Sequence, residues 1–226
     1  CLIMPIQDQQ EFLDWHYKTG HTSFKFLKVL AEKGLIPRKL KNCREPVCSA
    51  CLYGKQTRRP WRTKAKPSKV GKVATRPGQR VHVDQLKSPT PGLIAQVKGW
   101  LTQTRYHIAT VFCNEFSNLT YVHIIELDTS EEMLEAKECF ESYTESHGVV
   151  IEGYHADNGQ FADNLFHKVM QQSGQTITFC RVGAHHQNGI IERCIQDLTK
   201  HARTMLLHAA HHWPRAVNSH LWPYTL

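Results

Sequence analysis

The sequence lacks the features of a membrane-spanning or secreted chain. Its apolar runs extend over a few residues, as in Val149, Val150 and Ile151, whereas a membrane-spanning helix needs about 20. No basic segment followed by an apolar one marks a signal peptide at the N-terminus, and no repeat or low-complexity tract is found. We therefore expect an intracellular protein with no membrane partner. Because the chain begins at Cys1 rather than Met, we interpret it as a piece of a longer protein.

One stretch of the chain has no acidic residue. Between Leu52 and Arg80 there are ten lysines and arginines and no aspartate or glutamate. The positive charge of this segment is therefore larger than the net charge of +8 on all 226 residues. Prolines and glycines in and near it disfavour a helix. Such a run is either an arm that contacts phosphates or a solvated linker. The candidate DNA contacts are Lys55, Arg58, Arg59, Arg62, Lys64 and Lys66.

Residues 11–51, before this arm, have few apolar residues. Thr22 or Ser23 can cap a helix that carries Phe24, Leu27, Leu30 and Ala31 on one face. Gly34 suits its C-terminal cap, and Pro37 blocks its continuation. We expect so small a module to lack a free-standing core. Modules of this size usually need a metal or disulfides to fold.

The module contains two closely spaced pairs of potential zinc ligands. His16 and His21 are separated by four residues, and Cys48 and Cys51 form a C-x-x-C. Zinc takes four N or S ligands in a tetrahedron, so this pattern predicts one structural zinc. The alternative is solvated histidines with free or disulfide-linked cysteines, and Cys43 is a less suitable substitute ligand. The remaining cysteines are interpreted as small buried hydrophobes in a reducing compartment: Cys1, Cys113, Cys139, Cys180 and Cys194.

After the arm, the pattern alternates between strands and helices. Alternating or continuous apolar residues predict strands over residues 79–86, 106–113, 119–125, 149–155 and 176–181. Thr129 and Glu132 form a capping box that opens a helix with Met133, Ala136, Phe140 and Tyr143 facing inward. Asp163 can cap a second helix, ended by Gly174, that presents Leu165, Phe166, Val169 and Met170. A last amphipathic helix is expected over residues 187–209. These elements predict an α/β fold with a mixed sheet and flanking helices.

Three carboxylates lie near the ends of these elements. Asp84 is in the first strand, on the face opposite its valines; Asp157 follows the fourth strand; Glu192 begins the last helix. Singly, Asp157 is compatible with a turn and Glu192 with a solvated helix N-terminus. A carboxylate between valines, as at Asp84, is unfavourable unless it is paired or metal-bound.

Together these residues resemble a known family. Asp84, Asp157 and Glu192, with 34 residues between the last two, are similar to the D,D(35)E triad of retroviral and retrotransposon integrases. The preceding module resembles the GAG-pre-integrase zinc domain of copia-type LTR retrotransposons. The supporting strings are residues 111–122, 155–161 and 187–193, and in the module Trp15-His16, His21, Cys48, Cys51, Gly54-Lys55 and Arg58-Arg59.

The resemblance implies a five-stranded ribonuclease H-like core and a polynucleotidyl transferase that inserts element cDNA into host DNA. Asp84, Asp157 and Glu192 would hold two Mg²⁺ (or Mn²⁺) ions; His16, His21, Cys48 and Cys51 one zinc. The partners would be DNA (element ends and host target) and further copies of the chain. The expected location is the nucleus or a cytoplasmic virus-like particle. Two alternatives remain: an inactive DNA-binding remnant and a ribonuclease H-like nuclease.

The expected organisation has three parts: a zinc module at residues 1–54, a basic linker at 55–79, and a catalytic core at 80–226 that is truncated at its C-terminus. The sequence departs from the family before the last helix. His185 and His186 stand where a Thr-Pro pair is common. They are either polar loop residues or groups that act on the substrate.

Overall fold

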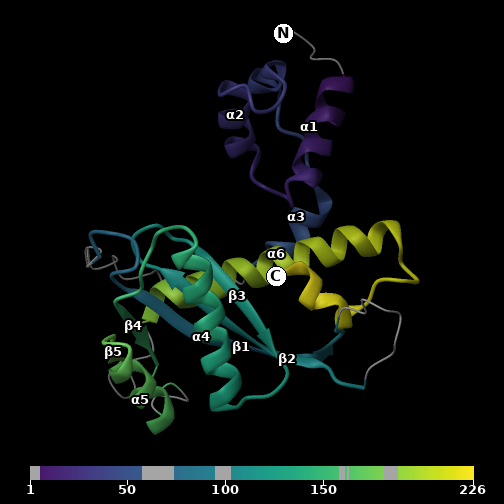
Figure 1. Ribbon diagram of the computed structural model, residues 1–226. Helices are drawn as coiled ribbons and strands as arrows, with labels where there is room; N and C mark the ends of the chain where they lie inside the picture. The colour runs from purple at the N-terminus through teal and green to yellow at the C-terminus, as the bar shows by residue number, and fades with distance from the viewer. Residues whose placement is uncertain (1–5, 58–73, 95–102, 158–160, 162, 181–187) are drawn as a thin grey trace, which may run out of the picture. The chain divides into compact units, whose positions relative to one another are not determined.

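The computed structural model describes residues 6–57, 74–94, 103–157, 161, 163–180 and 188–226 (Figure 1). Its contacts divide the chain into two compact units. The first contains residues 1–59, 199–218 and 225, and the second contains residues 60–198, 219–224 and 226. Most of the basic arm and the loop with His185 and His186 lie outside the described residues.

Short helices form the N-terminal part of the first unit. They are α1 (Ile6–Lys18), α2 (Phe24–Glu32), the 3₁₀ helix η1 (Arg38–Asn42) and α3 (Ser49–Gly54). The predicted helix is α2, and both of its predicted ends are confirmed. Ser23 Oγ accepts the amide of Phe26 at 3.3 Å, and Gly34 takes the left-handed φ of 76° that ends the helix.

A small apolar cluster joins α1, α2 and η1. The sequence predicted no free-standing core, and the structure corrects this in part, because α1 brings Phe12 against the buried face of α2. The cluster is still small, and units with so small a core usually need a metal or disulfides to fold. Its buried members are Phe12, Leu27, Ala31, Ile36, Leu40 and Cys43.

A five-stranded mixed sheet forms the centre of the second unit. Its order is β3-β2-β1-β4-β5, in which β1 runs antiparallel to β2 and parallel to β4. This order and these directions are those of the ribonuclease H-like fold, and the predicted fold class is confirmed. The strands are β1 (Val81–Gly92), β2 (Tyr106–Asn114), β3 (Thr120–Ile125), β4 (Gly153–Ala156) and β5 (Thr176–Phe179).

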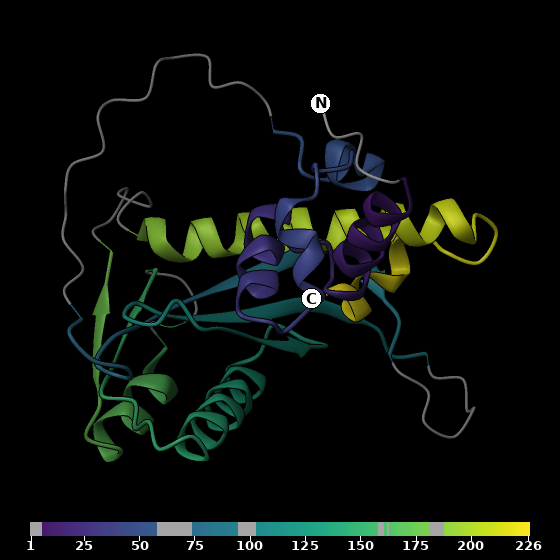
Figure 2. The same cartoon turned by 90° about the horizontal axis from the view of Figure 1, so that it is seen from above.

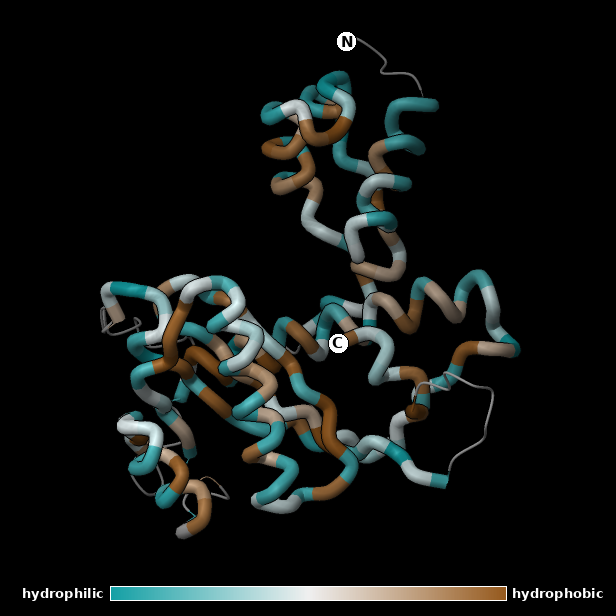
Figure 3. The backbone as a smooth tube through the Cα atoms, in the orientation of Figure 1, coloured by the Kyte–Doolittle hydropathy of each residue, from teal (hydrophilic) through white to brown (hydrophobic). Residues whose placement is uncertain are grey.

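Helices cover both faces of this sheet. Figure 2 shows α4 (Ser130–Glu145) and α5 (Asn164–Gln172) on one side and α6 (Gly189–His212) on the other. The larger core lies between the sheet and α4 and α5, where Val81 and Val83 of β1 pack. Val111, Cys113 and Ile191 form the core on the α6 side. Figure 3 shows hydrophobic segments along the strands that these helices cover.

The chain ends in the 3₁₀ helix η4 (Ser219–Thr225), which packs beside the end of β1. Trp222 Nε1 donates to Thr90 O at 2.9 Å, and the Leu93 amide donates to His220 O at 2.8 Å. None of the helices in the described part of the chain combines the length and apolarity needed to cross a bilayer.

The predicted fourth strand is too long at its start. It was expected from residue 149, but β4 begins at Gly153. The amide of Val149 instead bonds Thr144 O at the end of α4, and the amide of Glu152 bonds Gly78 O before β1. These bonds use the donors that a longer strand would need for its ladder.

The predicted helix faces also need correction. Tyr143, which was expected to face inward, is exposed, and so is Leu165 among the apolar residues of the second predicted helix. Lys137 is buried instead, where its Nζ donates to Glu141 Oε2 at 2.9 Å. An apolar stripe read from spacing alone does not anticipate that a buried lysine finds a partner one turn along its own helix.

The capping box before α4 is half formed. Thr129 Oγ1 accepts the Glu132 amide at 3.3 Å, as predicted. The Glu132 carboxylate, however, accepts the amides of Glu126 and Leu127. It therefore fixes the loop between β3 and α4 rather than closing the reciprocal bond to Thr129.

Candidate metal-binding and catalytic sites

His16, His21, Cys48 and Cys51 converge at one point of the first unit. Their ligand atoms all lie within 4.8 Å of one another. His16 comes from the last turn of α1, and His21 follows the turn after it with a left-handed φ of 61°. Cys48 is the N-cap of α3, and Cys51 lies in the first turn of that helix. The two pairs, far apart in sequence, therefore meet where α1 ends and α3 begins.

Each histidine turns one ring nitrogen to the cluster and the other to a partner. His16 Nε2 lies 3.3 Å from Cys51 Sγ, and its Nδ1 donates to Thr22 O at 2.7 Å. His21 Nδ1 lies 3.5 Å from both sulfurs, and its Nε2 lies 2.9 Å from His208 Nδ1 of α6. Histidines that bind a metal are oriented in this way by their second nitrogen.

Burial keeps these histidines neutral, which is the form that binds a metal. It lowers the pKa of His16, and together with the nearby His16 and His208 rings it lowers the pKa of His21 to about 4. Cys43 is in the apolar cluster rather than in this group. A buried set of two imidazoles and two thiols suits tetrahedral zinc, so the four residues fit the predicted ion.

In the second unit, the sheet register brings Asp84 and Asp157 together. Val83 of β1 is the partner of Ala156 of β4 in the parallel ladder, and an aspartate follows each of them. Neighbouring strands lie about 4.8 Å apart, so the two carboxylates come from adjacent positions. Asp84 pairs with Val111 across β1 and β2, which places it on the face of the sheet that α6 covers.

Glu192 approaches the same face from the first turn of α6. Burial raises the pKa of the Cys180 thiol, and the charges of Asp157, Asp84 and Glu192 raise it further. All three carboxylates thus lie near this one thiol, which follows β5. Glu192 is exposed, whereas Asp84 and Asp157 are half-buried.

The three carboxylates do not form a second tight ligand group. Among the described residues, His16, His21, Cys48 and Cys51 alone form a set of three or more potential ligands at metal-binding distance. Oxygen ligands on three separate elements have the chemistry that Mg²⁺ requires. The chain therefore has suitable donors around Cys180, held farther apart than the donors of the first unit.

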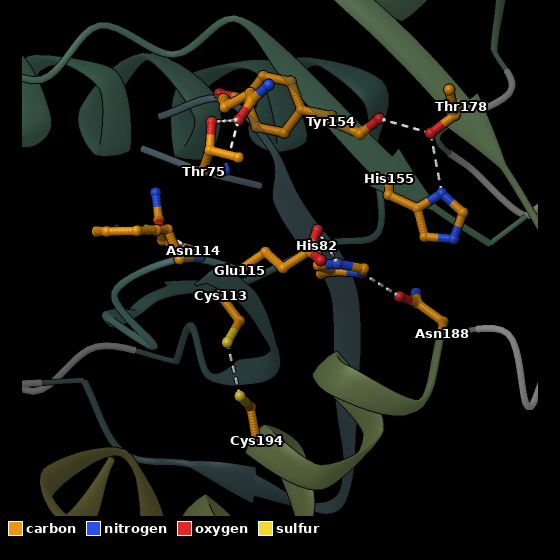
Figure 4. Close-up of polar contacts among 12 residues, drawn as sticks. Thr75, His82, Cys113, Asn114, Glu115, Tyr154, His155, Thr178, Asn188 and Cys194 are labelled. Carbon is orange, nitrogen blue, oxygen red and sulfur yellow. Dashed lines mark hydrogen bonds and ion pairs between the residues drawn. The ribbon is translucent and has the colours of Figure 1, made fainter. Parts of the chain in front are cut away.

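A buried polar cluster beside Asp84 was missed by the sequence analysis. His82 precedes Asp84 by two residues, and its Nδ1 lies 3.0 Å from Oδ1 of the buried Asn188. Its Nε2 lies 3.5 Å from Glu115 Oε2 (Figure 4). The position of His82 between two valines could have indicated this cluster, because a polar side chain that is buried with them needs a hydrogen-bond partner. The cluster ties the start of α6 to β1.

Lys55 is the one candidate DNA contact that the structure describes. Its Nζ donates to His21 O at 3.0 Å, so this lysine is bound to the backbone of the His/Cys site. The other candidate contacts lie outside the described residues: Arg58, Arg59, Arg62, Lys64 and Lys66.

Comparison with known proteins identifies the N-terminal part. Residues 6–56 match the GAG-pre-integrase domain family. The segment is thus similar to GAG-pre-integrase domains. The His/Cys site lies within it, and so does Lys55.

A longer match covers most of the chain. It is 24% identical over 205 residues to the retrovirus-related Pol polyprotein from transposon TNT 1-94 of Nicotiana tabacum, covering 88% of this chain. The chain spans 14% of the length of that polyprotein. With the GAG-pre-integrase domain, this match supports the predicted resemblance to a copia-type retrotransposon integrase fragment.

Solved structures of viral integrases are also similar to this chain. The HTLV-2 integrase catalytic core domain in complex with magnesium (dimeric form) matches with a TM-score of 0.43 and 15% identity, over 66% of this chain and 83% of that one. The simian T-cell lymphotropic virus intasome in complex with PP2A regulatory subunit B56 gamma matches with a TM-score of 0.48 and 16% identity, over 95% of this chain and 66% of that one.

Proposed function

We propose that this chain is the zinc module and catalytic core of a retrotransposon integrase, which joins element cDNA to host DNA by metal-dependent strand transfer. The observation that carries this proposal is the placement of the three carboxylates. Two come from adjacent parallel strands, the third begins the helix over the same face, and all three charges act on the Cys180 thiol.

Each carboxylate has a distinct role in this proposal. Following the family resemblance, Asp84 would be a ligand of both Mg²⁺ or Mn²⁺ ions, Asp157 of one and Glu192 of the other. When bound, the two ions would supply activation of an attacking hydroxyl and stabilisation of the leaving oxygen. The hydrogen bond between His82 and Asn188 holds the start of α6, and with it Glu192, against the strand that carries Asp84.

The first unit and the arm serve assembly on DNA. His16, His21, Cys48 and Cys51 would hold one structural zinc, which would link the end of α1 to the start of α3. The basic segment contacts phosphates without reading sequence, and multimers of the chain hold element ends and target together. We propose that the protein is located in the nucleus or in a cytoplasmic virus-like particle.

Strand transfer by a longer polyprotein segment that contains this chain tests the proposal. The assay joins a labelled element end to plasmid DNA with Mg²⁺. We expect Asp84→Asn, Asp157→Asn and Glu192→Gln each to abolish joining while the circular dichroism and DNA binding of the protein are retained. Two matched controls should stay active: Asp128→Asn, which removes the partner of Lys87, and Asp197→Asn on the exposed side of α6.

The two alternatives predict different results in the same assay. Activity that survives the triad substitutions contradicts the proposed site. DNA binding without joining, in the wild-type segment, identifies an inactive remnant. Cleavage of an RNA–DNA hybrid in place of joining identifies a nuclease of the same fold.

A further inference from the structure

Two cysteines on facing elements of the second unit lie unusually close. Figure 4 shows Cys113 of β2 and Cys194 of α6 pointing toward each other. Their sulfurs are 2.8 Å apart. Thr120 Oγ1 on β3 lies 3.7 Å from Cys194 Sγ and 4.0 Å from Cys113 Sγ. Both cysteines were predicted to be small buried hydrophobes, and they are 81 positions apart in the chain.

This separation is far shorter than ordinary packing between two sulfurs. A disulfide has an S–S bond of about 2.05 Å, so less than 1 Å of further approach joins the pair. The strand and the helix are already held at this distance, since Val111, Cys113 and Ile191 are fully buried between them and Cys194 packs against that cluster. The packing of α6 on β2 therefore keeps the two sulfurs close together.

The two thiols differ in access. Cys113 is fully buried, whereas Cys194 is half-buried at the edge of α6. A reagent in solution can therefore reach Cys194 and not Cys113. This asymmetry gives the pair an attacking and a resolving member, as in thiol–disulfide exchange.

We propose that Cys113 and Cys194 form a reversible redox site that a small-molecule disulfide oxidises. Cys194 loses its proton and its sulfur attacks the reagent, whose S–S bond breaks and whose first half leaves with that proton as a thiol. Cys113 then attacks the Cys194 sulfur of the mixed disulfide, and its proton leaves with the second half. Two protein thiols are oxidised and one small disulfide is reduced to two thiols.

The linkage would fasten α6 to β2 beside the proposed site. Cys194 follows Glu192 by two residues on α6, so the crosslink fixes the turn that carries this carboxylate. This consequence rests on the proposed function. Formation of the disulfide does not rest on the proposed function, because it depends only on the positions of the two sulfurs.

The test uses the zinc-loaded 226-residue chain and defined mixtures of oxidised and reduced glutathione. After an acid quench, free thiols are alkylated and the linked peptides are mapped by mass spectrometry. We expect a Cys113–Cys194 peptide that dominates other linkages, a raised unfolding midpoint, and reversal of both by dithiothreitol. Cys194→Ser and Cys113→Ser should each remove the peptide and the rise. Cys139→Ser, which changes a half-buried cysteine of α4, should change neither.

Three results would overturn the proposal. They are a stable mixed disulfide at Cys194 that never resolves, linked peptides distributed at random among the cysteines, and formation of the linkage only after denaturation. Failure of the proposed integrase function leaves the peptide map unchanged, so the two inferences fail independently.

Discussion

The two candidate metal sites are built from different kinds of donor, and they differ in how closely those donors approach. The two histidines and two cysteines of the first unit lie within 4.8 Å of one another. The three carboxylates of the second unit form no such group among the described residues. Neutral imidazoles and thiols can contact one another by hydrogen bonds, whereas like-charged carboxylates repel. The neutral donors can therefore lie in contact before a metal binds, whereas the two aspartates are held in place by the register of the sheet.

Loss of zinc should have the largest effect on stability at either site, because the first unit has a small core that cannot stabilise its helices alone. Cys48→Ser, or a chelator added to the full chain, should unfold α1, α2 and α3. Structural zinc contributes roughly 10–16 kcal/mol to such modules. Hydrogen exchange of these helices and zinc content are the measurements. Cys43→Ser, which lies in the apolar cluster, should retain the metal. Protected helices without zinc would show that the apolar cluster suffices.

Mg²⁺ should have a smaller effect, confined to the second unit. A bound metal would relieve the repulsion among the carboxylates and would bind the native state. A concentration of 100 times the Kd stabilises a protein by about 2.7 kcal/mol. Asp84→Asn should remove this rise in the free energy of unfolding, and Asp128→Asn should preserve it. Thermal unfolding of the core at graded Mg²⁺ gives the measurement, and an equal response of both variants would contradict the site.

His208→Ala should weaken zinc binding without removing a ligand. His208 Nδ1 contacts the nitrogen of His21 that faces away from the cluster, and loss of such a partner lowers metal affinity about tenfold or more. Competition with a chelating dye measures the affinity. His208→Gln should restore part of it, and His211→Ala, at an exposed position of the same helix, should have no effect. Equal affinities in all four proteins would show that the contact does not orient His21.

The smallest expected change is a gain in stability. In the absence of divalent metal, Asp157→Asn should raise the free energy of unfolding by about 1 kcal/mol, because it removes one of the like charges near Asp84. Asp197→Asn provides the control. Urea unfolding in the presence of a chelator measures the stability of both variants, and an unchanged or lower stability of Asp157→Asn would contradict net repulsion between the two aspartates.

Local patterns in the sequence predicted the elements well where neighbouring residues decide them. Ser23 and Gly34 bound α2 as expected, and Thr129 caps α4. The predicted start of the fourth strand was wrong, because a hydrogen-bond partner far away in the sequence decides where that strand begins. Residues 149–152 do not extend β4, because the amide of Glu152 bonds Gly78 O, far away in the chain. The destination of the Glu132 carboxylate likewise depends on the path of the loop before α4.

The sequence by itself determined the residue types of both sites. The spacing of two histidines and a C-x-x-C predicted a zinc site, and the resemblance to integrases predicted an oxygen-ligand site at Asp84, Asp157 and Glu192. Only the tertiary structure decided which donors meet. The parallel pairing of β1 with β4 sets Asp84 beside Asp157, and the packing of α6 on β2 brings Cys194 to Cys113. Such contacts depend on strand register and helix packing, which arise from many distant residues and leave no periodic signal in the sequence.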